Sequence, residues 1–452
     1  MPEIKVETIR RRARISTHSH IRGLGLDEKG RALPVADGLV GQREAREAAG
    51  IIVQIIKSGR MSGRGILFVG PPGTGKTALA IAIARELGED TPFVIMSGSE
   101  IYSSEKKKTE ILMEALRRSL GVRIRERRLV YEGVVKDVKV KRVRHPMAPY
   151  LTIPREARIV LATKDEEVPL TVGEEITEQI IEMGIRRGDV IWIDAETGRV
   201  FREGKAKDFA EVKTYDVETK RLVEIPRGPV KKEKEIVRTL TLHELDTIVA
   251  SQRALISFFG FAFEKEIPPE VRKEVDETVR KWIESNKGEI VPGVLFIDDA
   301  HMLDIEAFSF LTGAMESEFS PLIILATNRG MAKIRGTDIE SPHGIPLDLL
   351  DRLLIIPTRP YTPEEMREII KIRAEEEEDI KLTDEALEEL VRLATETSLR
   401  YAVQLLEPAY IIAGENGKEQ VGVEEVRRAR QLFIDLTASV KYLKEFESKF
   451  LK

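Results

Sequence analysis

A glycine-rich turn followed by lysine and threonine carries the clearest chemistry in this sequence. Residues 65–77 read Gly-Ile-Leu-Phe-Val-Gly-Pro-Pro-Gly-Thr-Gly-Lys-Thr, which fits the P-loop pattern G-x-x-x-x-G-K-[ST]. Glycine permits a tight turn that aims backbone N–H groups at phosphate oxygens, and a helix starting at Lys76 adds its positive dipole end. A ligand-free turn would not require Lys-Thr at the helix start. We predict that the nucleotide is bound by Gly70, Pro71, Pro72, Gly73, Thr74, Gly75, Lys76 and Thr77.

Two adjacent carboxylates end a later apolar run, Val294 to Ile297. A P-loop needs a second contact to its magnesium ion, and an aspartate after a neighbouring buried strand supplies it. Thr77 and Asp298 are therefore the predicted Mg²⁺ ligands. Asp299 is predicted to orient or deprotonate the attacking water. A pair of aspartates that only caps a strand end is the weaker alternative beside a P-loop.

Three further polar residues are catalytic candidates that depend on this site. Asn328 follows the apolar run 322–326, where its amide would contact the γ-phosphate or the water, although asparagine there is often only a turn former. Arg352 precedes another apolar run and is expected to project from one subunit towards the phosphates of the next. Arg400 lies in a helical region that would close over the nucleotide. Either arginine alone would more often be a surface ion pair.

Alternating apolar and helical segments must position these residues. Apolar runs at 66–69, 93–96, 294–297, 322–326 and 353–356 predict the strands of a parallel sheet. From 121 to 234 short β-rich runs with turn signals, including 211–217, replace the helical period. We predict an α/β fold with a core at 1–120 and 235–360, an inserted OB-type β-barrel domain at 121–234 and a helical lid at 361–452.

Composition narrows the class of protein. The chain has 452 residues, 42% of them hydrophobic, and a formal charge of −5, so any surface for nucleic acid must be local. It contains no cysteine, which excludes disulfides and thiolate chemistry. No apolar run reaches the roughly 20 residues of a membrane span, and Arg10 to Arg14 interrupt any secretory signal. The expected location is intracellular: cytoplasmic, or nuclear in a eukaryote, without membrane contact.

The order P-loop, Asp298-Asp299, Asn328, Arg352 and Arg400 resembles that of AAA+ ATPases: Walker A, Walker B, sensor 1, arginine finger and sensor 2. Residues 17–26, 296–304, 326–330, 341–348 and 399–406 look like the RuvB-like family of pontin and reptin, nearly end to end. The resemblance implies ATP and ADP as ligands, hexameric rings with hydrolysis between subunits, and work on DNA or on protein complexes; one ring or two stacked rings both remain open. It also implies that His18, His20, Ile21, Val40, Gly41 and Tyr361 lie near the adenine.

One departure from the family concerns Asp299, because the family usually has glutamate there. Aspartate is one methylene shorter, so its carboxylate is expected to fall short of the water unless the strand shifts. Hydrolysis would then be slow, while ATP binding would be unaffected.

The inserted segment leaves two functions open. Its basic residues, with Tyr131, Tyr150 and Trp192 nearby, suit single- or double-stranded DNA, although acidic residues interrupt the run and OB folds also bind proteins. A motor coupling hydrolysis to DNA unwinding or translocation is the first hypothesis. A nucleotide-switched scaffold for protein clients, with DNA-independent turnover, is the second. The basic residues are Arg123, Arg125, Arg127, Arg128, Lys136, Lys139, Lys141, Arg142, Arg144 and His145.

Overall fold

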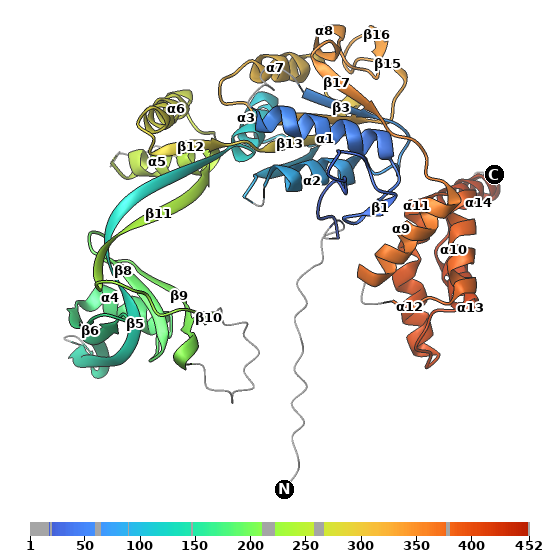
Figure 1. Cartoon of the computed structure of the whole chain (residues 1–452). Helices are drawn as coiled ribbons and strands as arrows, with labels where there is room; N and C mark the ends of the chain where they lie inside the picture. The colour runs from blue at the N-terminus through green and yellow to red at the C-terminus, as the bar shows by residue number, and fades with distance from the viewer. Residues whose placement is uncertain are drawn as a thin grey trace. The chain divides into compact units, whose positions relative to one another are not determined.

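The computed structural model of this chain separates into two compact units. The first comprises residues 1–122, 239–281 and 290–452, and the second comprises residues 123–238 and 282–289. Figure 1 shows the elements of both. The residues described are 18, 20–58, 65–88, 90–145, 148–209, 222–256, 266–376 and 380–450, without the side chains of 144–153, 254–256 and 447–450.

A five-stranded parallel sheet forms the centre of the first unit. Its order is β17-β3-β14-β13-β4, so the strand before the P-loop lies in the interior of the sheet. The strands are β3 (Gly65–Val69), β4 (Phe93–Ser97), β13 (Val294–Asp298), β14 (Leu322–Thr327) and β17 (Leu353–Pro357). Because all five run in one direction, their carboxyl ends share one edge, where ligands of open α/β sheets bind. The predicted parallel sheet is confirmed.

Helices cover both faces of this sheet. In β13, Val294 and Phe296 pack with α1 and α2, whereas Leu295 and Ile297 pack with α3 and α7. Burial on both faces explains why the strands read as continuous apolar runs. These helices are α1 (Arg43–Lys57), α2 (Lys76–Leu87), α3 (Lys108–Arg118) and α7 (Ile305–Met315). The unit also contains β1 (Val35–Ala36), β2 (Leu39–Val40), α5 (Leu242–Ile256), α6 (Pro269–Glu284), η2 (Ala300–Met302), β15 (Met331–Lys333), β16 (Glu340–Pro342) and α8 (Leu347–Leu350).

A bundle of helices follows the last core strand and forms the lid, as predicted. Its first helix starts with reciprocal capping: Thr362 N donates to Glu365 Oε2 at 2.9 Å, and Glu365 N donates to Thr362 Oγ1 at 3.3 Å. Buried Leu390, Leu393 and Leu406 belong to an apolar core of its own. The helices are α9 (Pro363–Glu376), α10 (Asp384–Glu396), α11 (Leu399–Gln404), α12 (Leu406–Glu415), α13 (Val423–Leu432) and α14 (Leu436–Phe450).

The second unit is β-rich. Its sheet has the order β10-β9-β8-β5-β6-β7, and β11 and β12 also pair with β5. The chain enters through β5 and leaves through β11, and residues 282–289, from the end of α6 to the start of β12, belong to this unit as well. The elements are β5 (Gly121–His145), β6 (Ala148–Ala162), β7 (Glu167–Val172), α4 (Glu174–Glu182), β8 (Asp189–Asp194), β9 (Val200–Ala206), η1 (Lys207–Phe209), β10 (Leu222–Val223), β11 (Lys231–Thr241) and β12 (Gly288–Val291).

Local assignments in this segment differ from the expectation of short strands alone. Residues 174–182 form helix α4, which places Thr177 and Ile180 in the interior. The expected strand at 211–217 and the side chains of Arg144, His145 and Tyr150 lie outside the described residues. Among the helices described, none is both long enough and apolar enough to cross a membrane.

Candidate functional site

The P-loop joins β3 to α2 through a turn that only glycine accommodates easily. Gly70, Gly73 and Gly75 have φ angles of 153°, 77° and 82°, in the region that disfavours side chains. Gly75 is also the N-cap of α2, so the first free N–H groups of that helix face the turn. The sequence folds here into the anion-binding end of a helix.

Lys76, the first residue of α2, lies close to the two carboxylates predicted to share its site. Its Nζ donates to the carbonyl oxygens of Gly70 at 3.0 Å and Pro71 at 2.7 Å. Burial lowers the pKa of Lys76, and the positive charge of Arg400 lowers it as well. The negative charges of Asp298 and Asp299 act in the opposite direction. The phosphate cradle and the aspartates therefore meet in space although they are far apart in the sequence.

Strand register brings the carboxylates to this edge. β14 separates β3 from β13, with Thr327 opposite Val69 and Ile297 opposite Leu325. Asp298 is the last residue of β13, and the backbone N–H of Asp299 donates to Asp298 Oδ1 at 2.9 Å. Asn328 follows the end of β14 directly, so it lies between the P-loop and the aspartates along the sheet edge.

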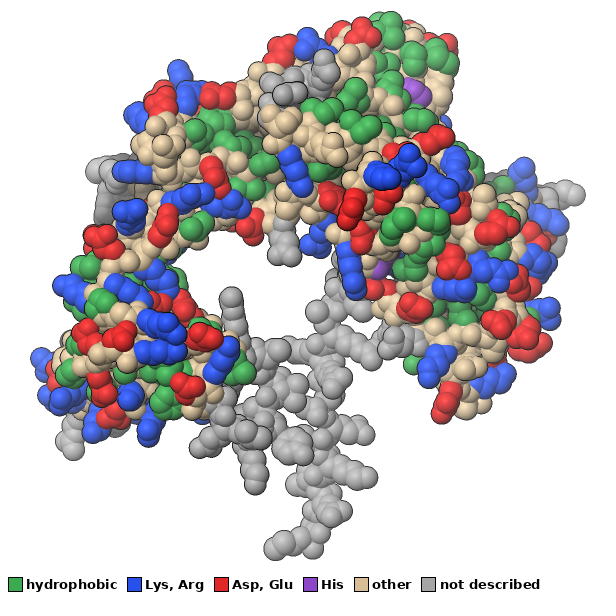
Figure 2. Space-filling model, in the orientation of Figure 1, with side chains coloured by type: hydrophobic (Ala, Val, Ile, Leu, Met, Phe, Trp, Pro, Cys, Tyr) green, Lys and Arg blue, Asp and Glu red, His purple; other side chains and the backbone are tan. Residues whose placement is uncertain are grey.

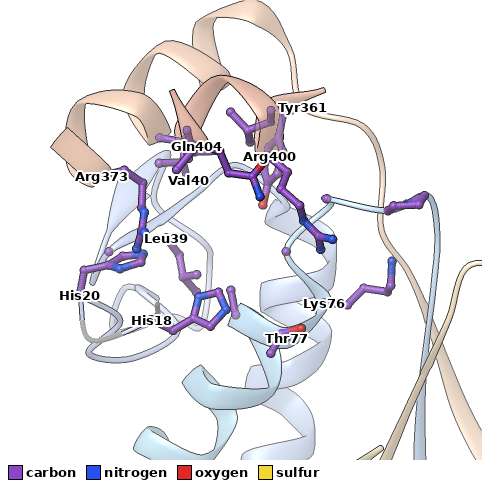
Figure 3. Close-up of a pocket in the computed structure, with 18 of the residues that line it drawn as sticks. His18, His20, Leu39, Val40, Lys76, Thr77, Tyr361, Arg373, Arg400 and Gln404 are labelled. Carbon is purple, nitrogen blue, oxygen red and sulfur yellow. The ribbon is translucent and has the colours of Figure 1, made fainter. Parts of the chain in front are cut away.

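A cavity of about 800 Å³ opens between this edge and the lid. Figure 3 shows Arg373, Arg400 and Gln404 from the lid facing His18, Lys76 and Thr77 from the core. On the core side the cavity has the carboxylates of Asp298 and Asp299 beside Lys76, and on the lid side it has apolar residues and arginine. This combination suits a nucleotide together with a hard cation. The predicted site residues that line this cavity are His18, His20, Val40, Pro72, Gly73, Gly75, Lys76, Thr77, Asp298, Asp299, Asn328, Tyr361 and Arg400.

Comparisons with known proteins agree with this geometry. The TIP49 P-loop domain matches residues 14–364, and the TIP49 AAA-lid domain matches residues 369–435. The chain belongs to the TIP49 family. It is 46% identical over 458 aligned residues to RuvB-like helicase 1 of Aedes aegypti, and equally to that of Drosophila pseudoobscura pseudoobscura. Each alignment covers 99% of this chain and 100% of the relative. The chain is thus a nucleotide-binding AAA+ ATPase, and the family resemblance read from the sequence is confirmed.

Two residues that this TIP49 chain was expected to place beside the adenine do not line the cavity. Ile21 is only 1% exposed and packs in the apolar layer beneath α1 and α2. Gly41 faces the lid helix α9, where an added Cβ would lie 2.3 Å from Glu365 Oε1. Leu39 and Val40, which directly precede Gly41, line the cavity instead.

Arg352 is also absent from the cavity lining. It follows α8, and its guanidinium donates to Glu316 Oε1 at 2.6 Å on the surface. Gly70, Pro71 and Thr74 contribute to the P-loop but likewise do not line the cavity. Thr74 is 2% exposed, because its side chain points into the protein.

The histidines of the N-terminal segment face the lid. Burial lowers the pKa of His18 to about 4, and His20 and Arg373 lower it as well. The pKa of His20 is lowered by burial and by Arg373, against an opposing effect of Glu376. Both imidazoles are therefore neutral near pH 7. No group of three or more His, Asp or Glu side chains within the described part of the chain has a metal-binding arrangement.

Sequence reasoning missed most of the lid's contribution to the cavity. Leu399, Val403, Gln404 and Glu407 line it together with Arg400. Their spacing of three or four residues along α11 and α12 marks one helical face, so the position of Arg400 was a usable signal. Ile369 and Arg373 also line the cavity and lie four residues apart in α9, but no sequence motif in that helix indicated them. The remaining lining residues are Gly38, Leu39 and Ala78.

Proposed function

We propose that this chain is a ring-forming motor that hydrolyses ATP with Mg²⁺ and acts on DNA or nucleoprotein complexes. The observation that carries the proposal is that Lys76, Asp298 and Asn328 line one cavity, which Arg400 closes from the lid. Phosphoryl transfer depends mainly on positioning and charge stabilisation, and this cavity provides both.

Each residue then has a distinct role. Lys76 and the α2 N-terminus neutralise the β- and γ-phosphates. The hydroxyl of Thr77 and the carboxylate of Asp298 are the oxygen donors that suit Mg²⁺, which would neutralise charge developing on the phosphates. Asp299 accepts the proton of the attacking water, and Asn328 orients it. His18, His20, Val40 and Tyr361 contact the base, with Ile21 and Gly41 supporting them from behind.

The position of Arg352 supports the proposed ring. This arginine is solvent-accessible and outside its own chain's cavity, so it is suited to a neighbour's nucleotide. A hexamer, single or stacked in two rings, would place one arginine at each interface. Turnover would then require assembly.

The relatives' name, helicase, supports strand separation of a nucleic acid as the activity. We propose DNA as the nucleic acid, with residues 121–234 as an OB-type module that binds it. A nucleotide-switched scaffold for protein clients is the second candidate, and a specific observation favours it. Basic side chains of the inserted unit are paired with carboxylates: Arg123 with Glu289, Arg128 with Asp194, and Lys141 with Glu156. In Figure 2 the two charges are intermixed over the visible face of this unit. Such pairing weakens attraction to a phosphate backbone.

Steady-state ATP hydrolysis with and without single-stranded DNA tests the choice. A motor should hydrolyse ATP at least several-fold faster with DNA and should unwind a forked duplex, and Lys76→Ala should abolish both. A scaffold should hydrolyse ATP at the same rate with or without DNA and should capture a protein client only in one nucleotide state. Absence of any ATP binding by the wild-type chain would refute both functions.

A further inference from the structure

Four of the five residues between the last core strand and the lid helix α9, Thr358 to Tyr361, form a connection that contacts the P-loop at both of its ends. Strand β17 pairs with β3 in a register that places Pro357 opposite Val69, and Thr358 N donates to Val69 O at 2.8 Å. The connection, Thr358 to Tyr361, therefore begins beside the first residue of the phosphate-binding turn. Helix α9 of the lid starts two residues after it.

Thr358 fills the space behind that turn with a buried hydroxyl. Its Oγ1 lies 2.7 Å from Thr74 Oγ1, and the Thr74 hydroxyl lies 2.9 Å from Pro71 O. Thr74 and Thr358 are only 2% and 6% exposed, so water does not compete for these bonds. An added Cβ on Gly70 would lie 2.3 Å from Thr358 Oγ1. The glycine that opens the P-loop is thus required by the connection as well as by the turn.

Tyr361 makes a second contact at the other end of the turn. Its hydroxyl donates to Thr74 O at 3.3 Å and would lie 2.4 Å from a Cβ added to Gly75. Burial raises the pKa of Tyr361 to about 12, with Glu365 acting in the same direction, so the hydroxyl keeps its proton at any working pH. Gly75 is the N-cap of α2, whose N–H groups face the phosphates.

The opposite side of the connection is anchored to the start of the core. Gln42 Nε2 donates to Arg359 O at 2.5 Å, and Arg359 N donates to Gln42 Oε1 at 3.2 Å. The Arg359 guanidinium donates to both carboxylate oxygens of Glu365 in α9. The connection is therefore bonded to the P-loop, to the core and to the lid at once. It cannot act as a free hinge.

We propose that Thr358 and Tyr361 are positioning residues which couple the conformation of the P-loop to the orientation of the lid. A nucleotide that reshapes residues 70–75 moves Thr74 and Gly75, and these move the two hydroxyls on the connection. The lid follows as a body because α9 begins there. This inference rests on the proposed nucleotide site. It adds Thr358 to that site and gives Tyr361 a positioning role beside its proposed contact with the base.

The first test compares Thr358→Val with Thr358→Ser. Valine keeps the branched shape and removes the hydroxyl, whereas serine keeps the hydroxyl. We expect Thr358→Val to weaken Mg²⁺-ADP binding about fivefold, as the loss of one buried hydrogen bond implies, with kcat for ATP changing less than KM. Thr358→Ser should bind within twofold of wild type. Equal loss in both variants would show that packing matters and the hydroxyl does not, which would overturn the proposal.

The second test measures lid movement directly. The chain has no cysteine, so Lys57→Cys in α1 and Glu419→Cys in the lid give two labelling sites for energy transfer. Labelled chain is diluted in unlabelled chain, and transfer is followed on adding saturating Mg²⁺-ADP. Wild type should show a change, and adding Thr358→Val with Tyr361→Phe should reduce it at least twofold. Tyr361→Phe alone should reduce the change in energy transfer by an intermediate amount. This single variant replaces the double variant in the test if Thr358→Val fails to fold.

The outcomes separate this inference from the proposed function. ADP binding is measured by calorimetry on the unlabelled wild type. Absent binding would refute the nucleotide site itself. Normal binding with no change in transfer, or with the same change in the double variant as in wild type, would overturn the coupling alone.

Discussion

At the scale of single residues, Asp299 has little freedom to compensate for its short side chain. Its φ of 48° is in the left-handed region, and its N–H is bonded to Asp298 Oδ1. On the other side, a Cβ added to Gly98 would lie 2.6 Å from Asp299 O, so the chain after β4 packs closely against this backbone. A shift of the strand end that would move the carboxylate towards the water is therefore opposed from two directions.

We predict that Asp299→Glu raises kcat for ATP about tenfold, or about 1.4 kcal/mol in activation free energy, with little change in KM. The added methylene extends the carboxylate without moving the backbone. Asp299→Asn is the matched control, because asparagine tolerates the same φ but cannot accept the proton, and its kcat should fall at least a hundredfold. Single-turnover and steady-state hydrolysis measure both. Equal rates for Asp299→Glu and wild type would contradict the geometric explanation.

Because His18 is held neutral, the stability of the folded chain should depend on pH. The pKa of His18 is about 4 in the folded chain and about 6.5 in an unfolded one, so between these values the unfolded state binds more protons. The contribution of His18 to the free energy of unfolding should therefore be fully present above pH 6.5 and should decline as the pH falls towards 4. We predict that the melting temperature of wild type drops between pH 7 and pH 5 by about 2 °C or more beyond the drop for His18→Gln. Equal drops would show that His18 is not held neutral by the fold.

At the scale of elements, the N-terminal segment is folded around one buried arginine of α1. Arg46 is 0% exposed and donates to the carbonyl oxygens of Leu24, Gly25, Leu33 and Gly41. These bonds hold residues 24–41 against α1. The same segment presents Leu39 and Val40 to the nucleotide cavity. The guanidinium thus links the packing of α1 to the shape of the site.

We predict that Arg46→Lys lowers the melting temperature by several degrees and weakens nucleotide binding at least threefold. A lysine ammonium cannot reproduce the planar fork, and buried carbonyls would lose their donors. Thermal unfolding and ADP titration measure the two effects. Arg85→Lys is the control, since Arg85 is an exposed residue of α2. A similar loss in both variants would indicate a general effect of replacing arginine.

The difference between predicted and observed elements has a physical cause. The core strands were predictable because burial on both faces demands apolar runs, as in Val294 to Ile297. Strand β11 was missed because charged residues occupy the first positions of its half-buried face: Lys232 and Lys234 both pair with the buried Glu132. Arg46 and Thr358 were missed for a similar reason. Their roles depend on residues that contact them only in the folded structure, and hydrophobic periodicity in the sequence does not predict such contacts.

At the scale of the whole molecule, Arg352 lies apart from the other residues proposed to act in catalysis. The cavity gathers Lys76, Asp298, Asp299 and Asn328, while Arg352 is bonded to Glu316 on the surface of the same unit. An exposed ion pair of this kind contributes little to stability, so exchanging Glu316 for a phosphate across an interface costs little. If the proposed ring forms, the turnover rate per chain should rise with protein concentration.

Mixing two inactive variants tests whether Arg352 acts on a neighbouring chain. Lys76→Ala lacks phosphate binding but keeps the arginine, and Arg352→Ala has the reverse defect. If the arginine acts between chains, random mixed rings prepared from equal amounts should contain about one productive interface in four, namely an Arg352→Ala site beside a Lys76→Ala neighbour. Hydrolysis by the mixture should therefore recover to about a quarter of the wild-type rate, although each variant alone has almost none. If Arg352 serves its own chain, no mixture regains activity, because every chain then lacks one essential group. Mass measurement of the mixed assembly verifies that chains have exchanged before the rates are compared.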